Sequence, residues 1–267
     1  MKRIKTRLNT VIGAISALAA VLAAAPAQAL PLEFSARYAA TAHDMTVGRA
    51  ELHLERDGNQ YRYSSKIRAT GLVGLFYDGR IVEASTGTLT EHGLRPARYD
   101  YQRTGKGERE DNIRFAVDGR DALLHYKGDT RETPLPADAL DPLSLHIALM
   151  NDVAAGKQRM RYLVAEPRRV QVYEVAVTGR ERITTASGKF DAVRVDLVGR
   201  RDVTPDESFS LAKIDVPAIS DGKQTSFWLA PELDYLVVRI RHRDPDDGVV
   251  GIDLQNVETL RGSEVAS

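Results

Sequence analysis

Cysteine and histidine, the side chains most typical of zinc sites, are few in this chain. It contains no cysteine and six histidines. A zinc site needs three or four converging nitrogen, sulfur or oxygen ligands, and none of the histidines stands at such spacing from another. A metal site would therefore need histidines from distant segments to meet, and we expect neither a metal nor a cofactor. The histidines are His43, His53, His92, His125, His146 and His242.

Two acidic stretches were considered as sites. The run from Asp244 to Gly248 lacks the spacing and the distal glutamate of an EF-hand, and its Asp-Gly pair is typical of a hairpin turn. The segment from Asp202 to Glu207 holds three carboxylates that could form an acid/base pair. Its composition is that of a solvated loop, which is the interpretation we favour.

Nucleophile and phosphate motifs are missing from the sequence. There is no Gly-x-Ser-x-Gly elbow, and no Gly-rich phosphate loop precedes a helix. Arg239, Arg241 and Arg243 alternate along one expected strand and could bind an anion, although acidic residues on neighbouring strands are the favoured partners. The sequence favours a non-enzymatic protein, and an enzyme remains the alternative.

The most frequent pattern is an apolar residue at every second position, which is typical of an antiparallel sheet with one wet face. These apolar residues would interdigitate as a packed core in a flat sandwich, the interpretation we favour. In a strongly curved sheet they could instead line a cavity for an apolar ligand. The candidate lining residues are Phe34, Tyr38, Leu52, Leu54, Tyr61, Tyr63, Trp228 and Val238.

A single helix is expected from Pro142 to Ala155, with Asp141 as its N-cap and proline in its first turn. Ser226–Arg243 reads as a hairpin that turns at Ala230–Asp234 and carries the only tryptophan, Trp228. The strand around Trp228 is apolar on both faces. We expect the helix to pack against this strand and to bury the indole.

The other expected elements are strands, joined by short turns. Gly71–Tyr77 reads as a bend in the sheet, and Asp202–Gly222 as a long loop. No Ser/Gly/Pro-rich linker divides the chain, so we predict one β-rich domain. Besides the hairpin, the expected strands lie near residues 32–38, 49–55, 61–68, 80–89, 96–103, 112–117, 122–126, 160–164, 170–177, 182–185, 192–198 and 250–254.

Residues 1–29 are typical of a secretory signal peptide. A basic start precedes an apolar run too short to span a membrane, and Ala27-Gln28-Ala29 has the small-x-small form of a cleavage site. We predict cleavage after Ala29, a periplasmic location, and a single domain over residues 30–267 without a transmembrane segment. That domain carries 33 basic and 37 acidic side chains, which argues against a nucleic-acid partner. Without cysteine it has no disulfides.

Several short motifs occur in a fixed order along most of the chain: Gly87–Leu89, Gly93–Tyr99, Leu140–Ser144, Gly179–Ile183, Ser187–Ala192, Phe227–Leu229 and Val237–Ile240. With these motifs the chain resembles the domain-of-unknown-function 3108 family, exported β-rich proteins of Gram-negative bacteria. The resemblance implies a strongly curved antiparallel sheet, an open or incomplete barrel similar to the periplasmic lipoprotein carriers, with one helix packed against it. It implies no catalytic residue, and Asp202–Gly222 is longer than the family pattern.

Three functions follow from this reading. The first is a non-enzymatic periplasmic protein whose curved sheet binds an apolar or amphipathic envelope component, such as a lipid or lipoprotein, or an envelope partner protein. The second is a scaffolding factor for envelope integrity with a filled core. The third is an envelope-acting hydrolase or transferase, which would need a cluster of catalytic groups that the sequence does not reveal.

Overall fold

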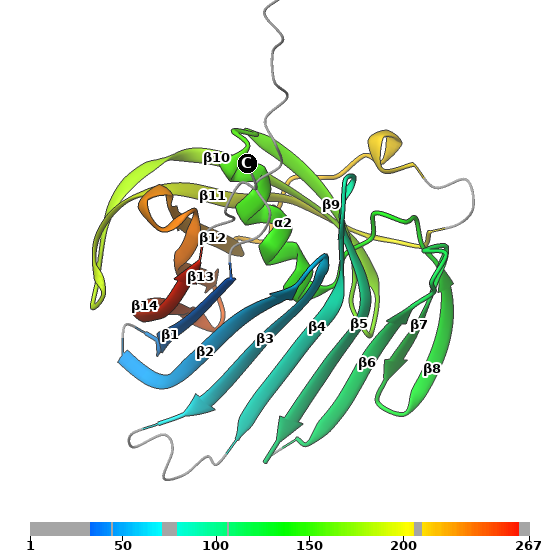
Figure 1. Cartoon of the computed structure of the whole chain (residues 1–267), viewed down its shortest axis with the longest axis horizontal. Helices are drawn as coiled ribbons and strands as arrows, with labels where there is room; N and C mark the ends of the chain where they lie inside the picture. The colour runs from blue at the N-terminus through cyan, green and yellow to red at the C-terminus, as the bar shows by residue number, and fades with distance from the viewer. Residues whose placement is uncertain (1–32, 44, 71–78, 106, 206–209, 262–267) are drawn as a thin grey trace, which may run out of the picture.

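The protein's computed structural model describes residues 33–43, 45–70, 79–105, 107–205 and 210–261. Within these ranges the chain forms fourteen strands and one α-helix (Figure 1). The strands of the first half are β1 (Glu33–Ala42), β2 (Met45–Asp57), β3 (Gln60–Ala69), β4 (Arg80–Thr90), β5 (Gly93–Thr104), β6 (Arg109–Phe115), β7 (Asp121–Tyr126) and β8 (Asp129–Pro134). Those of the second half are β9 (Arg159–Ala165), β10 (Val170–Thr185), β11 (Gly188–Val203), β12 (Gln224–Ala230), β13 (Leu236–Asp244) and β14 (Gly248–Arg261). The helix is α2 (Pro142–Ala154), and two short 3-10 turns are η1 (Leu211–Lys213) and η2 (Pro231–Leu233).

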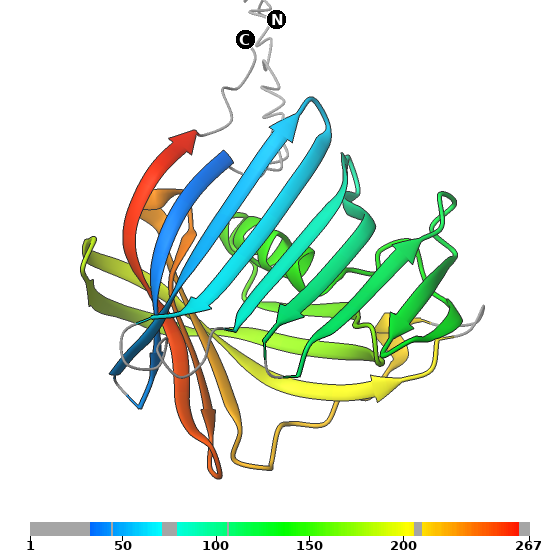
Figure 2. The ribbon, with the colours of Figure 1, turned by 90° about the horizontal axis from the view of Figure 1, so that it is seen from below.

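All fourteen strands belong to one antiparallel sheet. Its order runs β8-β7-β6-β5-β4-β3-β2-β1-β14-β13-β12-β11-β10-β9, so chain neighbours pair and the single long-range pairing joins β1 to β14. Strands β8 and β9 end the order, which leaves the barrel open. The sheet folds over so that α2 lies between its two halves (Figures 1 and 2). The expected curved, open antiparallel sheet with one packed helix is confirmed.

Two local predictions about strands were wrong. Strand β8 was not expected, because its sequence Asp-Thr-Arg-Glu-Thr-Pro carries charges where a buried strand alternates apolar residues. The segments near residues 170–177 and 182–185 form one continuous strand, β10, rather than two. A register shift between Val177 and Gly179 leaves Thr178 as the extra residue, and the strand continues through Gly179 without a turn.

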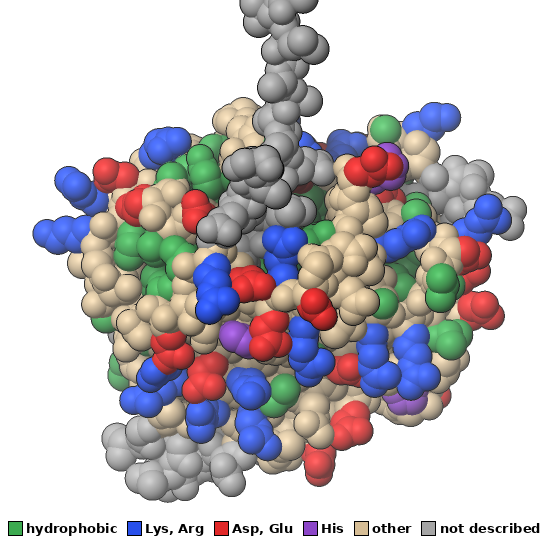
Figure 3. Space-filling view, in the orientation of Figure 1, with side chains coloured by type: hydrophobic (Ala, Val, Ile, Leu, Met, Phe, Trp, Pro, Cys, Tyr) green, Lys and Arg blue, Asp and Glu red, His purple; other side chains and the backbone are tan. Residues whose placement is uncertain are grey.

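The outer face of the sheet is charged, as the alternation of the strands predicts. Lysine and arginine side chains lie among aspartate and glutamate side chains over this face of the molecule (Figure 3). Arg68 pairs with Glu51 and Arg98 with Asp100, at 2.9 and 2.6 Å. Exposed pairs of this kind contribute little to stability but keep the surface solvated.

Some predictions fall on residues outside the described ranges. These are the signal peptide, residues 1–29, and the bend at Gly71–Tyr77. Within the described ranges, α2 is too short to cross a membrane, and no other helix there does so either. The prediction of a single domain stays a prediction.

Helix α2 begins as its sequence predicts. The Asp141 carboxylate accepts the N–H groups of Leu143 and Ser144 at 2.8 and 2.9 Å, and the Ser144 hydroxyl accepts the Asp141 N–H at 2.8 Å. This capping box satisfies donors that the first turn leaves without partners. Leu143, Ile147 and Met150 lie on the buried side of the helix, and the helix ends at Ala154.

The start of α2 joins the two halves of the sheet. The Ser85 hydroxyl of β4 donates to the Asp141 carboxylate at 2.6 Å, and Asp141 is fully buried. On the other side, the Leu140 N–H donates to the Leu163 carbonyl of β9 at 2.9 Å, and the Ala165 N–H donates to the Leu140 carbonyl at 2.8 Å. One dipeptide therefore contacts β4 and covers part of the free edge of β9.

We expect Asp141→Ala to lower the free energy of unfolding by about 2–4 kcal/mol, since it removes a helix cap and leaves buried donors without an acceptor. Asp141→Asn keeps an acceptor at the cap and should cost less. Chemical denaturation at pH 7 measures both, with Asp138→Ala as a control on an exposed aspartate three residues earlier. A loss as small as that of the control would contradict the anchoring role.

Candidate functional site

The eight residues predicted to line a ligand cavity belong to the main core, although Trp228 lies on the other face of the sheet from the rest of its lining. All are buried, and they belong to one contiguous apolar cluster. The Phe34 and Tyr63 rings meet edge to face at 5.8 Å, and the Tyr38 hydroxyl donates to the Val237 carbonyl at 2.9 Å. Three of the eight, Phe34, Leu54 and Tyr61, also border a groove of about 890 Å³ at the rim of β1–β4 whose remaining lining is mostly charged or polar.

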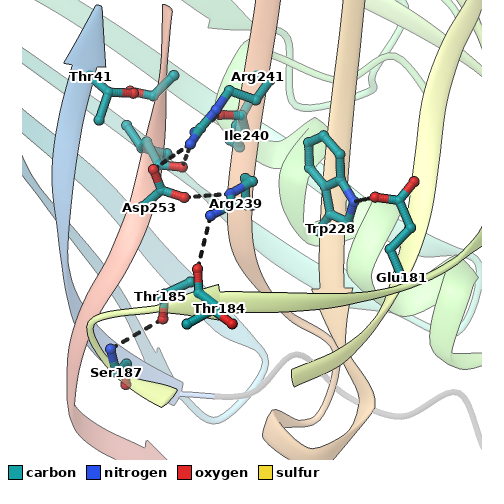
Figure 4. Close-up of polar contacts among 12 residues, drawn as sticks. Thr41, Glu181, Thr184, Thr185, Ser187, Trp228, Arg239, Ile240, Arg241 and Asp253 are labelled. Carbon is teal, nitrogen blue, oxygen red and sulfur yellow. Dashed lines mark hydrogen bonds and ion pairs between the residues drawn. The ribbon is translucent and has the colours of Figure 1, made fainter. Parts of the chain in front are cut away.

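Trp228 is buried on the face of the sheet that points away from α2. Its Nε1 donates to the Glu181 carboxylate at 3.0 Å (Figure 4). The Arg194 guanidinium lies 5.5 Å from the ring centroid. The hypothesis that α2 covers Trp228 is wrong, because strand alternation turns Phe227, not Trp228, toward the helix. Phe227 does contact the helix, with its ring 6.1 Å from that of His146.

The arginine series on β13 does not form an open anion site. Arg239 and Arg241 both pair with Asp253 of β14, as the alternation of charges on neighbouring strands favours (Figure 4). Arg239 also donates to the Thr184 carbonyl of β10 at 3.0 Å. The two guanidinium groups are therefore committed to structural contacts.

A cavity of about 300 Å³ lies between α2 and the strands of the second half of the sheet. Its apolar lining comes from Pro142, Leu145 and Leu149 of the helix region and from Tyr162, Val164, Val175, Leu197 and Phe227 of the sheet. The polar lining consists of His146, Glu166, Tyr173, Arg200, Thr225 and His242. An apolar cavity with a few polar groups is the usual form of a small-molecule site.

Most of the polar groups at the cavity already have partners. The Tyr173 hydroxyl donates to Glu166 at 2.6 Å, and the Arg169 guanidinium donates to the same carboxylate at 3.1 Å. Burial, followed by the charge of Glu166, raises the pKa of Tyr173 well above its usual value. Arg200 lies 3.5 Å from Asp221, at the long end of an ion pair.

His146 lies on α2, where its side chain is half-buried and belongs to the polar part of the cavity lining. Its ring meets Tyr63 and Phe227 edge to face, with centroids 6.3 and 6.1 Å apart. It borders the cavity, so part of the ring stays accessible. Burial lowers the pKa of His146 from 6.5 to about 4, because an imidazolium would lose its hydration among apolar neighbours. His146 is therefore neutral at pH 7.

A second group of ionisable residues lies near the N-terminus of α2. The Tyr99 hydroxyl donates to Glu83 at 2.5 Å, and the Tyr61 and Ser85 hydroxyls are 3.2 Å apart. Burial raises the pKa of Asp141 to about 6, and burial with the nearby Asp141 charge raises that of Glu83. These carboxyl groups are held by hydroxyl donors, which fits a structural anchor.

Within the residues that the structure describes, no group of three or more histidine or acidic side chains is placed to hold a metal ion. His53 lies on β2 and His125 on β7, far apart in the strand order. The acidic stretch from Asp244 to Gly248 forms a turn that its own contacts hold. The Asp244 carboxylate accepts the Asp246 N–H at 3.0 Å and pairs with Lys223 at 2.7 Å.

Sequence reasoning missed the residues that border the cavity. Leu149, Val164 and Val175 have the same alternation or helical spacing as filled core, so periodicity carries no signal for a hollow. Glu83 did offer a signal. It occupies an inward position of β4, on the same side as Ser85, where the pattern leads one to expect an apolar residue.

Comparison with known proteins places the chain in a family. The model of the family described as "Protein of unknown function (DUF3108)" matches residues 33–255. No curated protein matches the chain.

Two solved structures are similar to the chain at low identity. One is a "Beta-barrel-like Protein of Domain of Unknown Function DUF1849" from Brucella abortus, with 11% identity, a TM-score of 0.47, and coverage of 89% of this chain and 99% of that one. The other is described as a "putative lipoprotein" from Parabacteroides distasonis, with 11% identity, a TM-score of 0.31, and coverage of 86% and 96%.

The pKa of His146 predicts a pH dependence of stability. Between pH 6.5 and about 4 the unfolded chain binds a proton that the folded protein excludes, so the stability from the neutral ring is present above pH 6.5 and is lost as the pH falls toward 4. Asp141 acts with the opposite sign: its contribution is present below pH 3.8 and is lost as the pH rises through about 6.

We therefore expect the destabilisation caused by His146→Leu to shrink by about 2 kcal/mol between pH 7 and pH 4.5, since each unit of pKa shift is worth about 1.4 kcal/mol and pH 4.5 lies about two units below the unfolded pKa of 6.5. Urea denaturation at both pH values measures this difference. His92→Leu, which alters an exposed histidine, is the control. A His146→Leu effect that is the same at both pH values would show that the ring is not buried in its neutral form.

Proposed function

Because the chain belongs to the DUF3108 family of proteins of unknown function, we propose its role from its own site. It is an exported, non-enzymatic protein of the cell envelope that holds an apolar or amphipathic envelope component in the cavity beside α2. The observation that carries this proposal is the cavity itself, which lies between the helix and the curved sheet and is lined mainly by apolar side chains.

The size of the cavity suits one aliphatic chain. A volume of about 300 Å³ has room for about ten water-sized groups, given roughly 30 Å³ for each in the liquid. Eight buried methylenes would contribute about 6 kcal/mol, at about 0.8 kcal/mol each. That free energy corresponds to a Kd between about 1 µM and 1 mM before any polar contact is added. Such an affinity suits a protein that both takes up and releases its ligand.

The chemistry of the lining favours binding over catalysis. Glu166 is held by Arg169 and Tyr173, and His146 stacks between aromatic rings rather than beside a nucleophile. The signal-peptide pattern of residues 1–29 supports export to the periplasm.

The alternative is a scaffolding protein with a filled interior, which the eight packed core residues favour. The two functions differ in whether the cavity binds a ligand. Native mass spectrometry of protein purified from the periplasm would show a bound lipid only for the first.

Leu145 gives the direct test, because it is half-buried on α2 and borders the cavity. We expect the wild-type protein to bind the uncharged probe N-phenyl-1-naphthylamine saturably at one site, and Leu145→Trp to weaken binding at least tenfold by filling that space. Leu123→Trp is the control: it makes the same change on β7, where the leucine is 43% exposed. Equal binding by Leu145→Trp and wild type, with unchanged thermal stability, would overturn the proposed site.

A further inference from the structure

The charged residues that line the cavity come from different strands, since Glu166 follows β9 whereas Arg200 lies on β11 and His242 on β13, and this arrangement bears on the ligand. We infer that the ligand is an anionic single-chain amphipath, with a carboxylate or phosphate head at Arg200 and His242 and its chain beside Leu149 and Val164 of the cavity. This inference rests on the proposed function and specifies the ligand class of the same site.

The charge that remains available at the cavity is positive. Arg200 is the one lysine or arginine among the described residues that border it, and Glu166 is the one acid. Glu166 already accepts hydrogen bonds from Tyr173 and Arg169. A ligand cation would have to displace Arg169 from the Glu166 carboxylate. A ligand anion would only have to replace Asp221 as the partner of the Arg200 guanidinium.

Arg200 is placed to change partner. Its side chain is 32% exposed, and its contact with Asp221 is 3.5 Å long, on a carboxylate that is itself 46% exposed. A guanidinium presents its donors as a planar fork that matches both oxygens of a carboxylate or phosphate. Exchange of a long, solvated contact for a bidentate one would favour the ligand's head group.

His242 adds a hydrogen-bonding group to the lining that Arg200 also borders, and Thr225 orients its ring. The Thr225 hydroxyl lies 2.9 Å from Nδ1 of His242, and the other ring nitrogen has no hydrogen-bond partner among the described residues. If Thr225 donates to Nδ1, the proton of a neutral imidazole lies on Nε2, where it can be donated to a ligand oxygen. Both residues are half-buried and line the cavity.

The apolar lining fixes the orientation of the ligand. Leu149, Val164 and Val175 are buried and offer no hydrogen bond from their side chains. A charged head among them would lose its hydration without compensation, whereas an aliphatic chain gains by burial. The head must therefore stay with Arg200 while the chain occupies the apolar part.

A series of ligands with one chain length tests the inference on the wild-type protein. Dodecanoate, dodecyl phosphate, 1-dodecanol and dodecylammonium differ only in their heads and can be compared by displacement of N-phenyl-1-naphthylamine below their micelle concentrations. We expect both anions to bind at least tenfold more tightly than the alcohol, and the cation to bind most weakly. The ratio between the two anions distinguishes a fatty-acid-like ligand from a phosphate-headed one.

Variants then locate the head group. Arg200→Gln should remove the preference for the anions and leave dodecanol binding within twofold of the wild type. Arg201→Gln is the matched control, because it removes the same charge from the next residue of β11, where the side chain is exposed and points to the other face. Circular dichroism checks that both variants fold. If Arg200→Gln does not fold, the comparison of the four ligands on the wild-type protein still tests the inference.

The outcomes separate the two proposals. If none of the four compounds displaces the probe and the probe itself does not bind, the proposed function fails. If all four bind with similar affinity, or if dodecylammonium binds most tightly, the cavity holds amphipaths but the inference of an anionic head is overturned. A loss of anion preference in Arg201→Gln equal to that in Arg200→Gln would also overturn it.

Discussion

Two backbone hydrogen bonds and one carboxylate at the start of α2 hold together the two halves of the sheet. Leu140 pairs with β9 through its backbone, and Asp141 accepts from Ser85 of β4. An antiparallel sheet of this length curls because each strand twists relative to its neighbour, but twist alone does not fix how far it closes. The anchored helix fixes that separation. The cavity beside α2 exists because the helix cannot move freely toward either wall.

The polar groups of the interior divide their roles according to which side of the helix they occupy. Near the N-terminus of α2, Asp141 and Glu83 are bonded to the hydroxyls of Ser85 and Tyr99, which satisfies groups that would be costly to bury alone. On the flank facing the second half of the sheet, Arg200 keeps a long contact that a ligand can replace. Rigid anchoring on one flank and exchangeable contacts on the other are what a binding site on a stable scaffold requires.

The sequence predicted the elements that depend on local chemistry. The cap at Asp141, the proline in the first turn of α2 and the hairpin that turns at Ala230–Asp234 all follow from residue types at fixed positions. It could not predict which face of β12 the helix would contact, because Phe227 and Trp228 are both apolar and only the folded sheet shows that Phe227 points toward α2. The sequence also could not distinguish residues that line the cavity from residues that are packed in the core. Val175 and Leu52 follow the same alternating pattern, yet only Val175 borders the cavity.

The pairing of β1 with β14 has a consequence for how the protein acquires its fold. Glu33 lies opposite Arg261, so this pairing joins the first and last described strands. The chain loses conformational entropy when its two ends are brought together, before the contacts between them contribute. Sheets dominated by pairings between distant segments therefore fold slowly. The hairpins from β1 to β8 can form as the chain emerges, but the second edge of β1 stays unpaired until the last strand arrives. If the chain is exported unfolded, the interval before β14 docks is when that edge is open to association with other chains.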